Sequence, residues 1–489
     1  MEINPNQYGI TIVGLGPGEP ELITQQAWSV LERSREIYVR TSQHPALKAI
    51  KPEIQLFSFD DLYEQSATFQ DVYRRIVEKI LDLGRRQQGV VYGVPGNPFV
   101  AEITSLEIYR QALSLNLPVR VVAGMSFLEP LVIGLGLDPF QNCVLIDALE
   151  LSEMHVPSFS IAQPAIVAQI YSRTVASNVK LTLMSLYPDE HPVRLVHAAG
   201  TSYQLVEDLK LFEIDRSSNI GLLSSLFVPA MEKDYSFEAF LEIVARLRAP
   251  DGCPWDREQT RQSLRPYLLE ETYELLHALD ENDPQKICEE LGDLLLQVLL
   301  HSQISNEEGE FSISDVLKGI NRKIVHRHPH VFGDITVDDS QMVIRNWERI
   351  KQAEREENGQ QSASMLDGVS ITLPALSQAD QYQRRAARVG FDWCDIQGVQ
   401  RKVVEELEEV NAAENDQRRA EEIGDLLFSI VNLARWNNID AESALRQSNA
   451  RFRKRFALME KYAKQNGIIL SDLTLSELDE LWERAKTGL

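Results

Sequence analysis

The pattern of hydrophobic residues changes near residue 230, and this change constrains the fold more than any other feature of the sequence. Before it, short apolar runs alternate with helical stretches, as in 9–14 (GITIVG), 89–94 (GVVYGV), 119–123 (VRVVA) and 193–198 (VRLVHA). Such alternation is typical of a mainly parallel α/β sheet. After it, apolar residues recur at helical spacing, first at Phe237, Phe240, Leu241, Val244 and Leu247. We therefore predict an α/β domain followed by an all-α region.

The helical half contains an internal repeat. Tryptophans, acidic pairs, an Asn-x-Lys/Arg-xxx-Arg element and a Trp-Glu-Arg triplet recur in one order, at offsets of 128 to 138 residues. A polar segment at 354–364 (EREENGQQSAS) has the composition of a linker. We predict two copies of one helical unit. The expected domains are therefore 1–230, 236–353 and 365–489.

The balance of charge limits the classes of partner. The 489 residues include 49 basic and 73 acidic side chains, a net charge of -24, of which 231–489 carry -16. This excess of negative charge disfavours bulk nucleic acid and anionic lipid as partners. No signal peptide and no membrane span is recognisable, so we expect a cytoplasmic protein. The scattered cysteines are expected to be reduced thiols: Cys143, Cys253, Cys288 and Cys394.

Pairs of carboxylates recur in the helical half at a spacing that places both on one helix face. In the first copy the pairs are Glu271 with Glu274, and Glu290 with Asp293. The second copy repeats them as Glu406, Glu409, Glu422 and Asp425. Apolar stripes run beside the acids, so we expect the acids to border the core. Crowded like charges repel, and Mg²⁺, which prefers oxygen ligands, would remove the conflict.

The alternative interpretation is that these acids form solvated helix faces with i,i+4 ion pairs. We expect Lys and Arg not to be the i,i+4 partners inside the clusters. Together with the duplication, this favours eight metal ligands over two ordinary charged surfaces.

Basic residues near the acids are candidates for binding a polyphosphate. Lys323 with Arg327, and Arg451 with Arg455, lie four apart on predicted helices, and Arg418 lies one turn before Glu422. The alternative for each is ordinary surface solubility. His326, His328 and His330 resemble a metal tract. However, Pro329 interrupts any helix there and the second copy lacks a counterpart, so we favour a structural or substrate-edge role over zinc.

Glycine-rich turns follow three of the strand-like runs in the first half. They contain the following candidate cofactor-binding residues: Gly14, Gly16, Pro17 and Gly18; Gly96, Asn97 and Pro98; Gly124 and Ser126. Turns at the carboxyl ends of parallel strands build ligand clefts, so we expect a cleft here. The alternative is a set of tight strand-to-helix connections without a ligand.

The helical half resembles the MazG family of all-α nucleoside triphosphate pyrophosphohydrolases, which carry ExxE on one helix and ExxD on the next. The resemblance extends to 252–256 (GCPWD), 327–332 (RHPHVF), 390–393 (GFDW) and both Trp-Glu-Arg triplets. It implies Mg²⁺-dependent hydrolysis of a nucleoside triphosphate to the monophosphate and pyrophosphate. By position, the eight motif acids would be the metal ligands and catalytic residues.

The first half resembles the tetrapyrrole (corrin/porphyrin) methylase family through its GLGPG, VPGNPF and AGMSF turns, 181–184 (LTLM) and 196–201 (VHAAGT). The resemblance implies a two-lobed α/β fold that binds S-adenosylmethionine. Residues 36–45 (EIYVRTSQHP) and Gly-Asn-Pro at 96–98 depart from the Asp-rich strand and Gly-Asp-Pro frequent in that family. The whole chain is similar to YabN-type fusions of the two domains.

Three functional hypotheses follow. The first is a Mg²⁺-dependent nucleoside triphosphate pyrophosphohydrolase fused to a methylase-like domain. The second is principally an S-adenosylmethionine-dependent methyltransferase, with the helical half as a regulatory or assembly module. The third treats the helical repeat as an assembly module alone. Because short helices with broad apolar stripes commonly need partner helices, we expect a homo-oligomer, at least a dimer.

Overall fold

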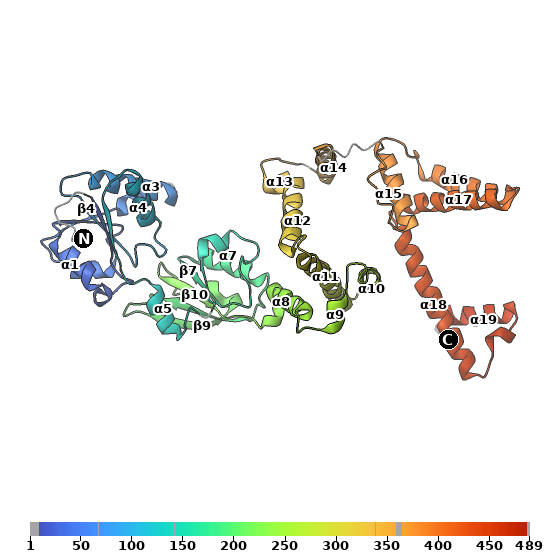
Figure 1. The fold of residues 1–489 in the computed structure, drawn as a ribbon, viewed down its shortest axis with the longest axis horizontal. Coiled ribbons are helices and arrows are strands. Elements are labelled where there is room, and N and C mark those ends of the chain that lie inside the picture. The colour runs from blue at the N-terminus through green and yellow to red at the C-terminus, as the bar shows by residue number, and fades with distance from the viewer. Residues whose placement is uncertain (1–8, 67, 141, 338, 358–363, 487–489) are drawn as a thin grey trace. The chain divides into compact units, whose positions relative to one another are not determined.

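The computed structural model describes residues 9–66, 68–140, 142–337, 339–357 and 364–486 (Figure 1). Two compact units divide the chain at residues 243 and 244. Residues 358–363 of the predicted polar linker lie outside the described ranges. Within those ranges, no helix combines the length and hydrophobicity that crossing a bilayer requires.

The first sheet of the first unit is entirely parallel, in the order β3-β2-β4-β1-β5. Its strands are β1 (Ile10–Gly14), β2 (Glu36–Val39), β3 (Gln55–Ser58), β4 (Val90–Val94) and β5 (Val119–Val122). Helices connect them, including α1 (Gln25–Arg33), α3 (Phe69–Gly84) and α4 (Ile103–Ser114). Alternate residues of a strand point to opposite faces, so Ile12 packs with α3 and α4 while Val13 packs with α1. Burial on both faces explains the continuous apolar runs.

The second sheet of this unit has the order β6-β7-β10-β8-β9 and is mostly antiparallel. Its strands are β6 (Val144–Asp147), β7 (Ala165–Ala168), β8 (Pro192–His197), β9 (Leu205–Lys210) and β10 (Ser224–Val228). Only β6 and β7 are parallel. The grouping of 193–198 with a parallel sheet is therefore wrong. A short connection from β8 to β9 permits only antiparallel pairing, because a parallel crossover needs a dozen or more residues.

The second unit is helical throughout its described residues, as its coiled ribbons show (Figure 1). Helix α8 (Phe237–Arg248) leads into it. The first repeat contains α9 (Pro254–Glu258), α10 (Arg265–Glu281), α11 (Pro284–Glu307), α12 (Ile313–Arg327), α13 (Pro329–Phe332) and α14 (Ser340–Glu357). The second contains α15 (Ala375–Arg388), α16 (Ile396–Ala412), α17 (Asp416–Trp436), α18 (Ala441–Gln465) and α19 (Leu475–Lys486). As expected, the helix ends before Pro329.

Each repeat is built around a helical hairpin, α10–α11 in the first and α16–α17 in the second. Asn282 ends α10 in the left-handed conformation (φ 53°), and the Asp283 carboxylate accepts from the backbone N–H of Gln285 to begin α11. In the second copy, the Asn415 side chain accepts from the N–H of Arg418. These caps are encoded locally, and the short turns make each pair of helices antiparallel neighbours.

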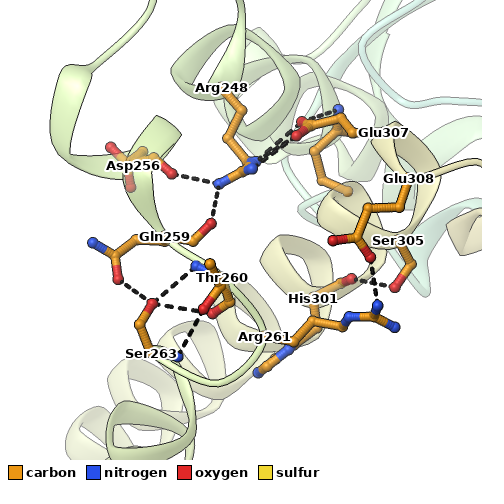
Figure 2. Close-up of polar contacts among 11 residues, drawn as sticks. Arg248, Asp256, Gln259, Thr260, Arg261, Ser263, His301, Ser305, Glu307 and Glu308 are labelled. Atoms are coloured by element: carbon orange, nitrogen blue, oxygen red, sulfur yellow. Dashed lines mark hydrogen bonds and ion pairs between the residues drawn. The ribbon is translucent and has the colours of Figure 1, made fainter.

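An ion pair fastens the segment before each hairpin to the far end of the hairpin. In the first repeat, Arg248 is 6% exposed and donates to both Glu307 carboxylate oxygens, at 3.0 and 2.7 Å, and to the carbonyls of Asp256 and Gln259 (Figure 2). In the second repeat, the arginine lies on the hairpin: Arg435 binds both oxygens of Asp392 at 2.6 and 3.0 Å. Both repeats thus use an arginine–carboxylate pair for this connection, although the residues involved do not occupy matching positions of the repeat.

We expect Arg248→Gln to lower the free energy of unfolding of the helical unit by about 2 kcal/mol, because it leaves two carbonyls and a carboxylate without their charged donor. Urea unfolding followed by circular dichroism measures this loss. The matched control is Arg261→Gln, whose ion pairs with Glu308 and Glu310 are exposed and should contribute below about 1 kcal/mol. Equal losses in both variants would contradict a special role for Arg248.

Candidate functional site

Three carboxylates converge on the first hairpin. Ligand oxygens of Glu271, Glu274 and Glu290 all lie within 4.8 Å of one another. They meet because Glu274 lies seven residues before the end of α10 and Glu290 six residues after the start of α11, so the tight turn brings them level. Asp293, the fourth predicted acid, is not part of this group of three.

The electrostatics of the first group follow from crowding. Partial burial, followed by the charges of Asp293 and Glu274, raises the pKa of the Glu271 carboxyl. Partial burial and the charge of Glu274 likewise raise the pKa of Glu290. Holding these negative charges together therefore costs electrostatic free energy, and a bound cation would lower that cost.

The second hairpin forms the corresponding group from Glu406, Glu409 and Glu422, whose oxygens also lie within 4.8 Å of one another. Glu406 and Glu422 are 4% and 8% exposed, and the buried Oε2 of Glu406 has no hydrogen-bond partner among the described residues. Burial and the charge of Glu406 raise the pKa of Glu409. A buried carboxylate oxygen without a donor is the kind of ligand that a metal ion satisfies. Asp425 is not part of this group of three.

Two cations contact the second group, contrary to the expectation that Lys and Arg would not be i,i+4 partners of these acids. The Lys402 ammonium lies 2.8 Å from Glu406 Oε1, and Arg418 Nε lies 3.2 Å from Glu422 Oε1. Both pairs have i,i+4 spacing, which sequence reasoning overlooked at Lys402. Arg418 therefore contacts motif acids in this structure.

Of the four other residues predicted to bind phosphate, two contact tryptophan rings and two are exposed to solvent. Arg327 lies 5.6 Å from the centre of the Trp347 ring and pairs with Glu354 at 2.5 Å, and Arg455 lies 5.7 Å from Trp482. These two arginines thus anchor the tryptophans of both Trp-Glu-Arg triplets. Lys323 and Arg451 are exposed on α12 and α18.

The histidine tract interacts locally. His328 Nδ1 lies 2.7 Å from the Ile324 carbonyl, and its ring lies 5.6 Å from that of His330. His326 Nε2 lies 3.9 Å from Glu354. The candidate metal groups found among the described residues do not include these histidines. The structural or substrate-edge role expected from the sequence stays a prediction.

The three glycine turns meet in the first unit, because β4, β1 and β5 are adjacent parallel strands. Gly16 and Gly96 exchange backbone hydrogen bonds of 3.3 and 2.8 Å, and the Asn97 side chain donates to the Gly124 carbonyl at 2.9 Å. A Cβ at Gly124 would lie 2.4 Å from the Gly96 oxygen, so only glycine permits this approach. The N–H groups of Gly16 and Gly96 thus bind the neighbouring turn.

The other residues predicted to bind a cofactor in these turns differ in how closely neighbouring atoms pack around them. The Ser126 hydroxyl donates to Glu129 and accepts from the Leu128 N–H, so its polar contacts are local. A Cβ at Gly18 would clash with the Thr201 side chain at 2.5 Å. In contrast, a Cβ at Gly96 would meet nothing closer than Ser126 Cα at 4.0 Å, so Gly96 borders open space. Pro17 and Pro98 complete the first and second turns.

Sequence reasoning missed two polar features beside these turns. His44 is 7% exposed and its Nε2 donates to the Gly16 carbonyl, which leaves Nδ1 as an acceptor without a partner among the described residues. Burial lowers the pKa of His44 and keeps the ring neutral. Arg40, at the end of β2, pairs with the buried Glu102 and donates to Tyr63 at 2.9 Å. The one sign of these features in the sequence was that residues 36–45 depart from the Asp-rich strand frequent in the methylase family.

Two family profiles match the chain. The profile of the tetrapyrrole (corrin/porphyrin) methylases matches residues 9–215, and that of the MazG nucleotide pyrophosphohydrolase domain matches residues 259–332. The first match covers both sheets of the first unit up to β9. The second covers the hairpin that carries Glu271, Glu274 and Glu290.

Relatives extend these matches along the chain. The uncharacterized protein YabN of Bacillus subtilis is 42% identical over 98% of this chain and 98% of its own length. The nucleoside triphosphate pyrophosphohydrolase/pyrophosphatase MazG of Thermotoga maritima is 47% identical over 52% of this chain and 96% of its own length. A uroporphyrin-III-C-methyltransferase from Thermus thermophilus aligns at 19% identity, covering 45% of this chain and 92% of its own, with a TM-score of 0.36. The chain belongs to the YabN family, in which a tetrapyrrole methylase-like domain precedes a MazG nucleotide pyrophosphohydrolase region.

Proposed function

We propose that the helical half hydrolyses nucleoside triphosphates to the monophosphate and pyrophosphate with Mg²⁺. The observation that carries this proposal is the pair of three-carboxylate groups, each within 4.8 Å, on equivalent hairpins of the MazG region. Two relatives of the helical half are named nucleoside triphosphate pyrophosphohydrolases, which supports the same reaction.

The residues present fit a divalent cation. The first group offers crowded carboxylate oxygens with raised pKa values, and the second offers the buried Glu406 Oε2, which has no hydrogen-bond partner among the described residues. Glu271, Glu274 and Glu290 would hold the ion in the first hairpin, and Glu406, Glu409 and Glu422 in the second. Asp293 and Asp425 are the further candidate ligands of the two hairpins. When bound, Mg²⁺ supplies electrostatic stabilisation of the phosphate charge and makes water more acidic.

The chain's own contribution to the reaction is to orient and deprotonate water. Hydrolysis of the bond between the α and β phosphates requires a base that accepts a proton from the attacking water. While the other acids of a group hold the ion, one carboxylate of the group can orient the attacking water and accept its proton.

We expect the double variant Glu271→Gln/Glu406→Gln to release pyrophosphate at least about 100-fold more slowly than the wild type, because both ligand groups lose a charge with little change in shape. Release from assorted nucleoside triphosphates, with and without Mg²⁺, is the measurement. Glu270→Gln/Glu408→Gln is the matched control, since these exposed acids lie next to the ligands but outside both groups. Unchanged release in the first double variant would refute the assignment.

We also propose that the helical half assembles with a second copy of the chain. The helices that carry the acids leave apolar side chains uncovered, including Leu269, Leu291, Val404 and Leu407, each 50% exposed or more. The expected core-facing stripes are thus only partly covered within one chain. Hydrophobic faces of this kind favour association.

Light scattering should therefore give a mass at least twice that of one chain. Leu291→Glu/Leu407→Glu is expected to reduce this mass to that of a monomer, because each charge would have to be buried at the interface. Leu475→Glu, on the exposed start of α19, is the control and should not change the mass. A monomeric wild type would contradict the proposal.

For the first unit we propose binding of S-adenosylmethionine at the meeting point of the glycine turns. Open space at Gly96, and the partnerless acceptor Nδ1 of His44 beside Gly16, support a small-molecule site there. The match to the tetrapyrrole methylases makes S-adenosylmethionine the leading candidate. We also infer a cytoplasmic location, which the four free cysteines support.

Asn97→Asp should weaken S-adenosylmethionine binding about tenfold in calorimetry, because the carboxylate cannot donate to the Gly124 carbonyl and repels it. The second and third turns would then separate. Asn116→Asp, at an exposed turn away from the three loops, is the control. No heat of binding in the wild type would refute the proposed ligand.

A further inference from the structure

Three polar side chains of the second sheet form a chain of hydrogen bonds at one end of that sheet. His197, the last residue of β8, is 5% exposed. Its Nε2 lies 2.6 Å from the Glu207 carboxylate on β9, and its Nδ1 lies 2.8 Å from Ser224 Oγ at the start of β10. The Ser224 hydroxyl also accepts from the Gly221 N–H at 2.9 Å. These residues play no part in the sites described so far.

The charge of Glu207 fixes the direction of these hydrogen bonds. Burial raises the pKa of the Glu207 carboxyl, but side-chain hydrogen bonds, first from Ser217 and then from His197, outweigh burial and hold that pKa below its usual value. A carboxylate only accepts, so His197 Nε2 donates to it. In the neutral ring, Nδ1 is then an acceptor, and the Ser224 hydroxyl donates to it. His197 therefore holds Ser224 in one position.

The start of β10 supports two loops of the second sheet. The Leu223 carbonyl accepts from the Ala198 N–H at 2.9 Å, in the loop after β8. The Ser224 carbonyl accepts from the Ile170 N–H at 3.0 Å, in the loop after β7. Ala198 and Gln169 have φ angles of 49° and 67°, in the left-handed region that favours glycine. Other residues stay in that region only where the surrounding structure fixes them, so both loops depend on this support.

Both loops also contact the connections that carry the glycine turns of the first sheet. The Gly200 carbonyl accepts from the Glu19 N–H at 3.4 Å, and the Ser202 N–H donates to Glu19 Oε1 at 2.7 Å. The Gln169 side chain donates to the Ala101 carbonyl at 3.3 Å. Glu19 directly follows the first glycine turn, and Ala101 lies between the second turn and α4. The position of the two loops therefore determines how the second sheet borders the glycine turns.

We propose that His197 is a positioning residue for the S-adenosylmethionine site: by holding Ser224, it fixes both loops of the second sheet against the glycine turns. This inference rests on the proposed function of the first unit. His197 is buried, so it acts through the loops and not by contact with the ligand. A loop that is ordered before the ligand arrives loses little conformational freedom on binding, so the affinity is higher. Loss of the contact with Ser224 should therefore weaken binding.

Two substitutions of His197 separate positioning from packing. An asparagine amide takes the place of Nδ1 and can still accept from Ser224, whereas a glutamine amide takes the place of Nε2 and reaches only Glu207. In calorimetry of the full-length chain, His197→Asn should bind S-adenosylmethionine within about twofold of the wild-type affinity, and His197→Gln about tenfold more weakly. Glutamine fills more of the space of the imidazole, so a side chain that only packs would give the opposite order. Ser224→Ala should match His197→Gln, and serves as a second variant if His197→Gln does not fold.

Amide hydrogen exchange of the ligand-free chain gives a second measurement. Peptides that cover 169–172 and 198–204 should exchange about tenfold faster in His197→Gln and Ser224→Ala than in the wild type, and at the wild-type rate in His197→Asn. The matched control is His191→Asn, just before the other end of β8. His191 is 8% exposed and donates to the Pro229 carbonyl at 2.9 Å, so its substitution should lower stability without changing the two loops or the affinity.

Three results would overturn parts of this inference. Equal effects of His197→Asn and His197→Gln, or the same faster loop exchange in His191→Asn, would indicate a general loss of stability and overturn the positioning role. Faster loop exchange with unchanged affinity would overturn the link between the loops and the site. Absence of S-adenosylmethionine binding by the wild type would refute the proposed ligand. In that case faster exchange of both loops in His197→Gln would still support the hold of His197 on them, and unchanged exchange would overturn it.

Discussion

Repulsion between carboxylates is the constraint around which the helical half is organised. Each hairpin brings ligand oxygens of three glutamates within 4.8 Å of one another, and burial followed by the neighbouring negative charges raises the pKa values of Glu271, Glu290 and Glu409. The folded chain tolerates this because the rest of each repeat holds the hairpin closed. Short capped turns fix one end, and the buried ion pairs of Arg248 and Arg435 fasten the preceding segment near the other. These capped turns and ion pairs thus stabilise a crowded group of carboxylates that is electrostatically unfavourable until a cation binds.

The two repeats maintain the same geometry with different charges. Arg248 pairs with Glu307 in the first copy and Asp392 pairs with Arg435 in the second, at positions that do not match in the repeat, and the position of Tyr267 is occupied by Lys402. An ion pair depends on opposite charges and not on which helix carries the positive one. Backbone geometry can therefore be retained while the ion pairs of the two carboxylate groups differ.

Much of this protein was predictable from local patterns. Helical periodicity predicted the all-α second half, and the ExxE and ExxD spacing identified eight acids, six of which meet in two groups of three. The failures have physical reasons. Hydrophobic runs do not distinguish parallel from antiparallel strands, so β8 was grouped with the wrong sheet. Ion pairs depend on rotamers and neighbouring helices, so the contacts of Lys402 and Arg418 with the acids were missed. Burial of His44 and Glu102 depends on strands far apart in the sequence.

The sequence by itself determined which helices form and which oxygen ligands they carry, because periodicity, caps and i,i+3 spacing act within one or two turns of a single helix. Tertiary structure decided which acids stand together, which of them are already paired with cations, and that the N–H groups of Gly16 and Gly96 each donate to the carbonyl of the other. These outcomes depend on distances between segments that only packing brings together. The sequence specifies which residues carry a carboxylate, but the tertiary structure determines which groups surround each carboxylate and therefore its chemistry.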